Sequence, residues 1–139
     1  MASQDLETIQ NAVALGAARG QAKLNTLNAT AGALPAGAVT GSSDVTLVSS
    51  NATPGTQTFR SAAAMLADIG GGVVAPYSYN LRIVNTGTGT LTLAADSGAT
   101  VTLGAGTYTV PTNTFRDFIV AFPTSTTATV TTVGVGTWS

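Results

Sequence analysis

The chain of 139 residues contains no cysteine and no histidine. Without cysteine there can be no disulfide, and without either residue the usual structural zinc sites are excluded. The missing histidine also removes the commonest general base and every Ser-His-Asp arrangement. The sequence therefore predicts a protein that is not an enzyme and that needs no cofactor.

Charge is scarce as well. Charged residues make up 8% of the chain, against about 25% in an average soluble domain. The basic residues are Arg19, Lys23, Arg60, Arg82 and Arg116. They are too few and too widely spaced to displace counterions from a nucleic acid. Low charge favours a surface that neighbouring proteins cover.

Long apolar runs are also missing. No run approaches the roughly 20 residues that a membrane-spanning helix needs. The sequence begins Met-Ala-Ser-Gln-Asp-Leu-Glu, which is polar and acidic and unlike a secretory signal peptide. We therefore expect synthesis in a cytoplasm and no membrane partner.

Residues 1–57 are predicted to be an N-terminal helical arm followed by an extended connector. From residue 3 to about 28, apolar residues recur near helical spacing, with Gly16 and Gly20 weakening the middle, so one helix and two shorter helices both fit. The apolar stripe of this arm includes Leu6, Ile9 and Val13. Residues 29–57 are rich in small and turn-forming residues, with one convincing strand at 45–48.

Residues 58–139 are predicted to be a β-sandwich domain with a short leading helix. Thr58 can cap a helix that runs to Ile69 and ends at three glycines. From Val73 onward, apolar residues alternate with polar ones in six to eight short strands, and a bulge is expected near Thr131-Thr132. Many of the 25 threonines occupy the alternate strand positions, where a β-branched hydroxyl residue suits a solvated sheet face. The expected fold class is mainly β, a jelly-roll or β-sandwich.

Two features resemble sites of chemistry, and each has a simpler interpretation. Asp96 and Asp117 would serve as the carboxylate pair of a hydrolase if they met in space, but they read better as a turn residue and a strand-face residue. The Gly87-Thr88-Gly89 stretch lacks the third glycine and following helix of a phosphate loop, so we expect a hairpin turn.

The remaining candidates belong to an interface. Arg82 and Arg116 lie within predicted strands, where each forms either a contact across a subunit boundary or an intramolecular pair. Trp138 stands next to the C-terminal residue, and an indole there is normally buried against something, such as another subunit. The tyrosines and phenylalanines from Tyr77 onward would suit a sugar-binding cleft, but most fit a sandwich core better.

The C-terminal half resembles a known family. Its runs NLRIVNTGTGTLTL (80–93), VTLGAGTYTVP (101–111) and TVTTVG (129–134) are similar to small virion proteins of tailed phages. With its length and helical leader, the chain resembles the head cement proteins of short-tailed Bordetella-type phages. The resemblance implies a jelly-roll fold and no catalytic residues. It also implies self-association into dimers and binding across joints between major capsid protein subunits. For the oligomeric state, a trimer is the alternative to the dimer.

The expected function is therefore that of a structural virion protein, made in the host cytoplasm and located on the capsid surface. The alternative is a phage fibre or adhesin-type β-module that binds carbohydrate or another virion protein. A hydrolase that uses Asp96 and Asp117 is the third hypothesis.

Overall fold

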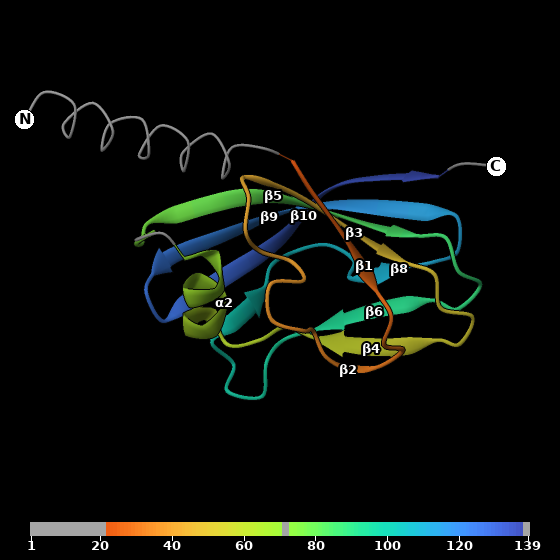
Figure 1. The fold of residues 1–139 in the computed structure, drawn as a ribbon, viewed down its shortest axis with the longest axis horizontal. Coiled ribbons are helices and arrows are strands. Elements are labelled where there is room, and N and C mark those ends of the chain that lie inside the picture. Colours follow the sequence, from red (N-terminus) through yellow and green to blue (C-terminus); the bar gives the residue numbers. More distant parts are fainter. Residues whose placement is uncertain (1–21, 71–72, 138–139) are drawn as a thin grey trace, which may run out of the picture.

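The computed structural model describes residues 22–70 and 73–137, and these residues form two stacked β-sheets with one helix (Figure 1). The six-stranded sheet has the spatial order β1 (Lys23–Leu27), β3 (Asp44–Ser49), β5 (Tyr77–Asn85), β9 (Thr114–Thr124), β10 (Thr127–Thr137) and β7 (Val101–Leu103). The four-stranded sheet has the order β2 (Gly32–Ala33), β4 (Gly55–Thr58), β6 (Leu91–Ala94) and β8 (Thr109–Val110). The expectation of a mainly β, two-layer protein is confirmed.

The chain reaches this architecture by winding as a parallel coil. It passes from the large sheet to the small one three times, from β1 to β2, from β3 to β4 and from β5 to β6. The strands of successive turns then pair in parallel within each sheet. A jelly roll is built from antiparallel strands, so the jelly-roll part of the expectation is not confirmed.

The turns that cross between the sheets pack directly on one another. A Cβ atom on Gly55 would lie 1.9 Å from the carbonyl oxygen of Thr30, and one on Gly87 would lie 2.1 Å from that of Asn51. These glycines are needed because no side chain fits between the stacked backbones. The Gly87-Thr88-Gly89 turn joins β5 to β6 in the other sheet, so the prediction of a hairpin there is wrong.

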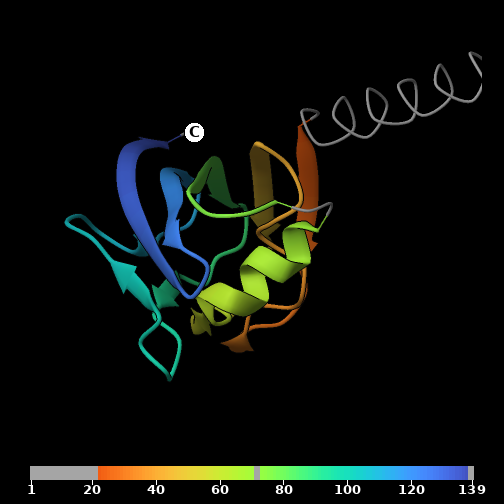
Figure 2. The ribbon, with the colours of Figure 1, turned by 90° about the vertical axis from the view of Figure 1, so that its left-hand side faces the viewer.

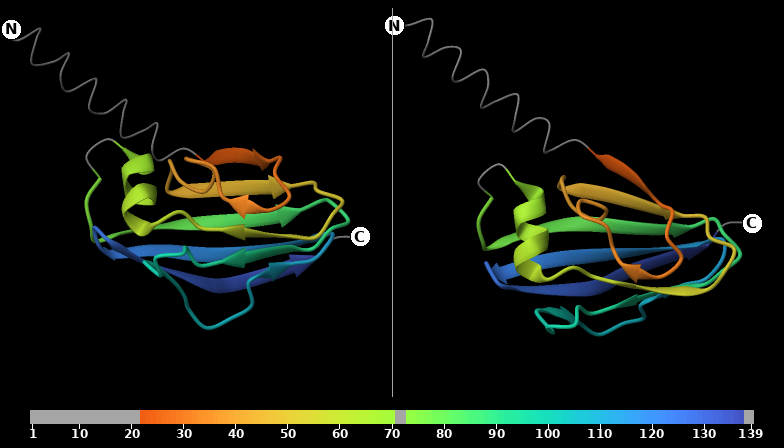
Figure 3. Two further views of the ribbon diagram at one scale, coloured as in Figure 1. Left: turned by 90° about the horizontal axis from the view of Figure 1, so that it is seen from below. Right: turned by 60° about the horizontal axis from the view of Figure 1, so that its bottom comes forward.

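The C-terminal half of the large sheet is an antiparallel hairpin of β9 and β10. The predicted bulge is confirmed, and the register shift falls between Thr132 and Gly134, which places Val133 at the bulge, just after the expected position. β5 pairs antiparallel with β9 and thereby joins the coil to the hairpin. Figure 3 shows the strands of the two sheets running along nearly the same direction.

One helix closes one end of the sandwich. Helix α2 (Ala62–Ile69) confirms the short internal helix, but it begins later than expected, because Thr58 belongs to β4. Its cap is Ser61, whose side chain accepts a hydrogen bond of 3.3 Å from the backbone N–H of Ala64. Met65 is buried in the core, and α2 lies across the end of the sandwich that faces the viewer in Figure 2.

Two predictions for the N-terminal region need correction. Residues 23–27 form β1, so the expected helix does not extend to residue 28. The expected connector contributes β2, β3 and β4 to the two sheets, and β3 covers the predicted strand at 45–48. The leading part of the expected helical arm, with Leu6, Ile9 and Val13, lies outside the described residues.

The core lies between the sheets and continues under α2. Its largest fully buried side chains include Phe59, Phe118 and Phe122, with Leu47 and Leu81 beside them. Burial on this scale provides the main favourable term for folding. The inward face of the large sheet therefore packs into this core.

Candidate functional site

The outward face of the six-stranded sheet carries the polar side chains of β3, β5 and β9. Side chains alternate along a strand, so the residues between the core positions point outward. One outward row joins neighbouring strands through Leu24, Thr46, Arg82, Asp117 and Gly134. The next row contains Asp44, Asn80, Ile119 and Thr131. The register of five strands thus brings together residues that are far apart in the sequence.

Arg82 and Asp117 form a bidentate ion pair in the first of these rows. Arg82 Nε donates to Asp117 Oδ1 at 2.7 Å, and Arg82 Nη2 donates to Asp117 Oδ2 at 3.0 Å. The hydrogen bond to Asp117 raises the pKa of Arg82, and burial opposes this rise only in part. The guanidinium carbon also lies 4.3 Å from the centre of the Phe115 ring. The two charges therefore largely neutralise each other within one molecule.

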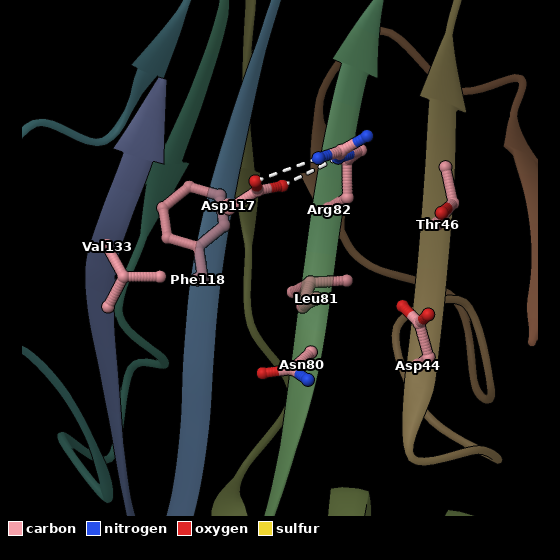
Figure 4. A pocket seen from close by; sticks show the side chains of 8 residues that line it. All are labelled: Asp44, Thr46, Asn80, Leu81, Arg82, Asp117, Phe118 and Val133. Atoms are coloured by element: carbon pink, nitrogen blue, oxygen red, sulfur yellow. Dashed lines mark hydrogen bonds and ion pairs between the residues drawn. The ribbon is translucent and has the colours of Figure 1, made fainter. Parts of the chain in front are cut away.

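A hollow of about 380 Å³ opens beside this ion pair (Figure 4). It is lined by Asp44, Thr46, Asn80, Leu81, Arg82, Asp117, Phe118 and Val133. Asp44 and Thr46 come from β3, Asn80 and Arg82 from β5, and Val133 stands at the bulge of β10. Across the part of the chain that the structure describes, the Asp44 carboxylate accepts no hydrogen bond and forms no ion pair.

Aliphatic side chains surround the hollow. Five large hydrophobic side chains are exposed in the described ranges, and three of them lie here: Leu24 (70% exposed), Ile119 (40%) and Val133 (57%). Leu24 neighbours Thr46, Ile119 neighbours Asn80, and Val133 lines the hollow itself. Polar and exposed aliphatic side chains therefore lie side by side on this face of the sheet.

The predicted interface residues have different outcomes. Arg82 lies at the hollow but pairs with Asp117 of its own chain, as the intramolecular interpretation expects. Arg116 points to the other side of β9, where its Nε donates to the carbonyl of Thr109. Trp138, like the apolar residues of the arm, lies outside the described residues.

The other basic side chains of the described region are also engaged within the molecule. Lys23 Nζ donates to the carbonyls of Gly37 at 3.0 Å and Thr40 at 2.8 Å. Arg60 pairs with Asp68 at 2.7 Å beside α2. Within the described ranges Asp44 thus forms no ion pair, although its charge, after the stronger effect of the Asp117 hydrogen bond, also favours the charged form of Arg82.

Asp96 and Asp117 do not form a common site. Asp96 lies in the turn after β6, where Oδ2 accepts from Thr100 Oγ1 at 2.7 Å and Oδ1 accepts from the Val101 N–H at 2.8 Å. Burial opposes ionisation of Asp96, but these hydrogen bonds outweigh it and lower its pKa. Asp117 is bound to Arg82 on the outward face of the other sheet. The interpretation as a turn residue and a strand-face residue fits both.

Within the described ranges no three His, Cys, Asp or Glu side chains gather as a metal site would require.

The aromatic residues belong mostly to the core, as expected. Tyr79, Phe118 and Phe122 are buried. Tyr77 is only half-buried and lines a second hollow of about 570 Å³ with Pro76, Ser78, Ala121, Phe122, Pro123 and Thr129.

Among the described residues, the one helix is too short to cross a membrane. No protein-family model matches the sequence, and the comparisons with curated proteins and with solved structures return no match.

Proposed function

We propose that this protein is a structural virion protein that binds the outside of a tailed-phage head and cements neighbouring major capsid protein subunits. The main support for this proposal is the outward face of the six-stranded sheet. It holds hydroxyl and aliphatic side chains, the mutually paired Arg82 and Asp117, and the single further charge of Asp44 around one hollow. Burying such a face under a partner costs little desolvation free energy, because few unpaired charges lose their hydration when the partner binds. A two-sheet sandwich, and not strictly a jelly roll, is sufficient for this role.

The edge strand β1 supports the same proposal. Its outer edge pairs with no other strand in the described part of the chain. Edge strands are normally protected by outward lysines, prolines or bulges. Here the only charged residue of β1, Lys23, is held by the carbonyls of Gly37 and Thr40. As far as the described residues go, this edge is therefore open to an extended segment of a partner.

Cementing follows from mass action. A protein that binds the assembled lattice better than free subunits stabilises the lattice. Each contact can be weak, since repeated contacts across a lattice raise the effective concentration of the next one. In this proposal the N-terminal arm, through Leu6, Ile9 and Val13, and the C-terminal Trp138 supply further contacts, and a dimer would double the number of attachment points.

The test is to purify heads that lack this protein and to compare them with complete heads under heating and osmotic shock. We expect the deficient heads to lose their DNA at lower temperature and to regain stability when the purified protein is added back. Equal tolerance of both kinds of head would end the cementing proposal.

A fibre or adhesin-type module is the second candidate, and the hollow at Tyr77 favours it. A tyrosine ring beside the hydroxyls of Ser78 and Thr129 resembles the elements of a sugar site. A trimer in solution that binds glycans, and loses that binding with Tyr77→Ala, would support this function over the first.

A further inference from the structure

We infer that the hollow on the six-stranded sheet receives a lysine or arginine side chain of the capsid partner, with Asp44 as the carboxylate that binds it. This inference rests on the proposed function for the identity of the partner. The chemical class of the bound side chain is inferred from the residues that line the hollow.

The charge of the hollow is the first argument. Its lining contains two carboxylates, Asp44 and Asp117, and one guanidinium, Arg82. Asp117 uses both oxygens on Arg82, at 2.7 and 3.0 Å. The remaining charge is the carboxylate of Asp44. A cationic side chain would complete the pairing, and such charge-assisted hydrogen bonds are among the stronger polar contacts in proteins.

Position is the second argument. Asp44 stands opposite Asn80, and Arg82 stands two residues further along β5. Two residues along a strand span roughly 6.6 Å. An incoming cation can therefore sit at Asp44 without displacing Arg82 from Asp117.

The border of the hollow determines the class of partner. Leu24, Ile119 and Val133 are aliphatic and exposed by 40% or more. Exclusion of water by a border of this kind strengthens a charged contact at its centre. A sugar would instead be expected to stack on an aromatic ring, and the nearby Phe115 ring already lies under Arg82.

The test measures binding of the purified full chain to heads that lack it. We expect Asp44→Asn to weaken binding by about 10-fold, the effect of losing one hydrogen-bonded charge, and to reduce the salt dependence of binding. Asp44→Glu should stay within about 3-fold of wild type, because it keeps the charge. Asp44→Lys should abolish detectable binding through like-charge repulsion.

Two further variants complete the test. Ser125→Lys, in the exposed turn between β9 and β10, changes the net charge by the same +1 as Asp44→Asn and should bind like wild type. Val133→Ser changes the border without touching a charge and should weaken binding severalfold. Circular dichroism and thermal unfolding establish that each variant is folded.

The outcomes are distinguishable. Failure of the wild-type chain to bind the heads would sink the proposed function and this inference with it. Wild-type binding that Asp44→Lys leaves intact would overturn the inference alone. An effect of Ser125→Lys equal to that of Asp44→Asn would also overturn it. So would competition by soluble sugars that is equally strong for wild type and for Asp44→Asn.

Discussion

Gly87 lies directly on the backbone of Asn51, and a Cβ atom at Gly87 would approach the Asn51 carbonyl oxygen to 2.1 Å and the Asn51 nitrogen to 2.6 Å. This contact joins the third turn of the parallel coil to the second. One turn earlier, Gly55 makes the same kind of close backbone contact with Thr30. The coil is therefore held together by backbone contact at its turns as well as by the strand ladders.

Gly87→Ala should destabilise the protein by about 1–3 kcal/mol or more, because the added methyl group meets backbone atoms that cannot move without shifting a strand. The matched control is Gly98→Ala. A Cβ there would lie 3.4 Å from Asp96 Oδ2, an ordinary contact, so the change should stay within about 0.5 kcal/mol. Urea denaturation of both variants measures the difference. Equal stability of the two would contradict the stacked-turn description.

The strands after Val73 were predictable from the sequence because their pattern has a simple physical cause. In β5, Tyr79, Leu81 and Ile83 are buried and the residues between them point outward, so apolar and polar positions alternate. The direction of pairing was not predictable from this pattern. An alternation of period two is the same for a parallel and an antiparallel neighbour, and it gives no indication of which sheet a strand joins.

β1 shows why a strand can resemble a helix. Lys23 and Asn25 point inward, where both donate hydrogen bonds to the carbonyl of Gly37. Leu24 points outward and is exposed. Over residues 23–25 the polar side chains thus point inward and the apolar one outward, which inverts the usual alternation, whereas Leu27 is buried in the ordinary way. Leu24 and Leu27 then fit a helical spacing that the structure does not have.

The candidate site was less predictable than the fold. Arg82 and Asp117 are 35 residues apart, and only the β5–β9 register brings them together. The hollow also depends on the bulge at Val133. The sequence indicated a bulge in this region, but it gave no indication of which residues of other strands lie beside it. Asp44 was not predictable as part of a site, because a lone aspartate at the start of a strand has many ordinary explanations.

The Arg82–Asp117 pair should contribute little to stability. Its side chains are 47% and 33% exposed, and exposed ion pairs are worth about 0.2–1 kcal/mol. A double-mutant cycle with Arg82→Met and Asp117→Asn should give a coupling energy in this range, smaller still in 1 M salt. A coupling above about 2 kcal/mol would mean that the pair is shielded from water, for instance by a second copy of the chain.

The hydroxyl of Tyr79 should matter far more than that of its neighbour Tyr77. Tyr79 is 4% exposed, and its hydroxyl donates to the carbonyl of Val39 at 2.5 Å. Burial also raises its pKa, so it stays protonated and remains a donor. Tyr79→Phe leaves a buried carbonyl unpaired and should cost about 1–3 kcal/mol. Tyr77→Phe, at a half-buried position, should cost less than about 0.5 kcal/mol. Chemical denaturation compares the two.

Asp96 should make stability depend on pH in the acid range. Hydrogen bonds from Val101 and Thr100 lower its pKa below the ordinary value of 3.8 in the folded chain. A carboxyl group with a depressed pKa stabilises the fold above its unfolded-state pKa, and this contribution disappears as the pH falls through the folded-state pKa.

The Asp96→Asn variant cannot ionise. The difference in free energy of unfolding between wild type and Asp96→Asn should therefore be constant near neutral pH and shrink from about pH 4 downward. Unfolding curves between pH 7 and pH 2 measure it, with Ser97→Ala as a control that leaves the carboxylate in place. A difference that did not change with pH would show that the Asp96 charge contributes nothing to the turn, and that any loss in the variant comes from altered hydrogen-bond geometry alone.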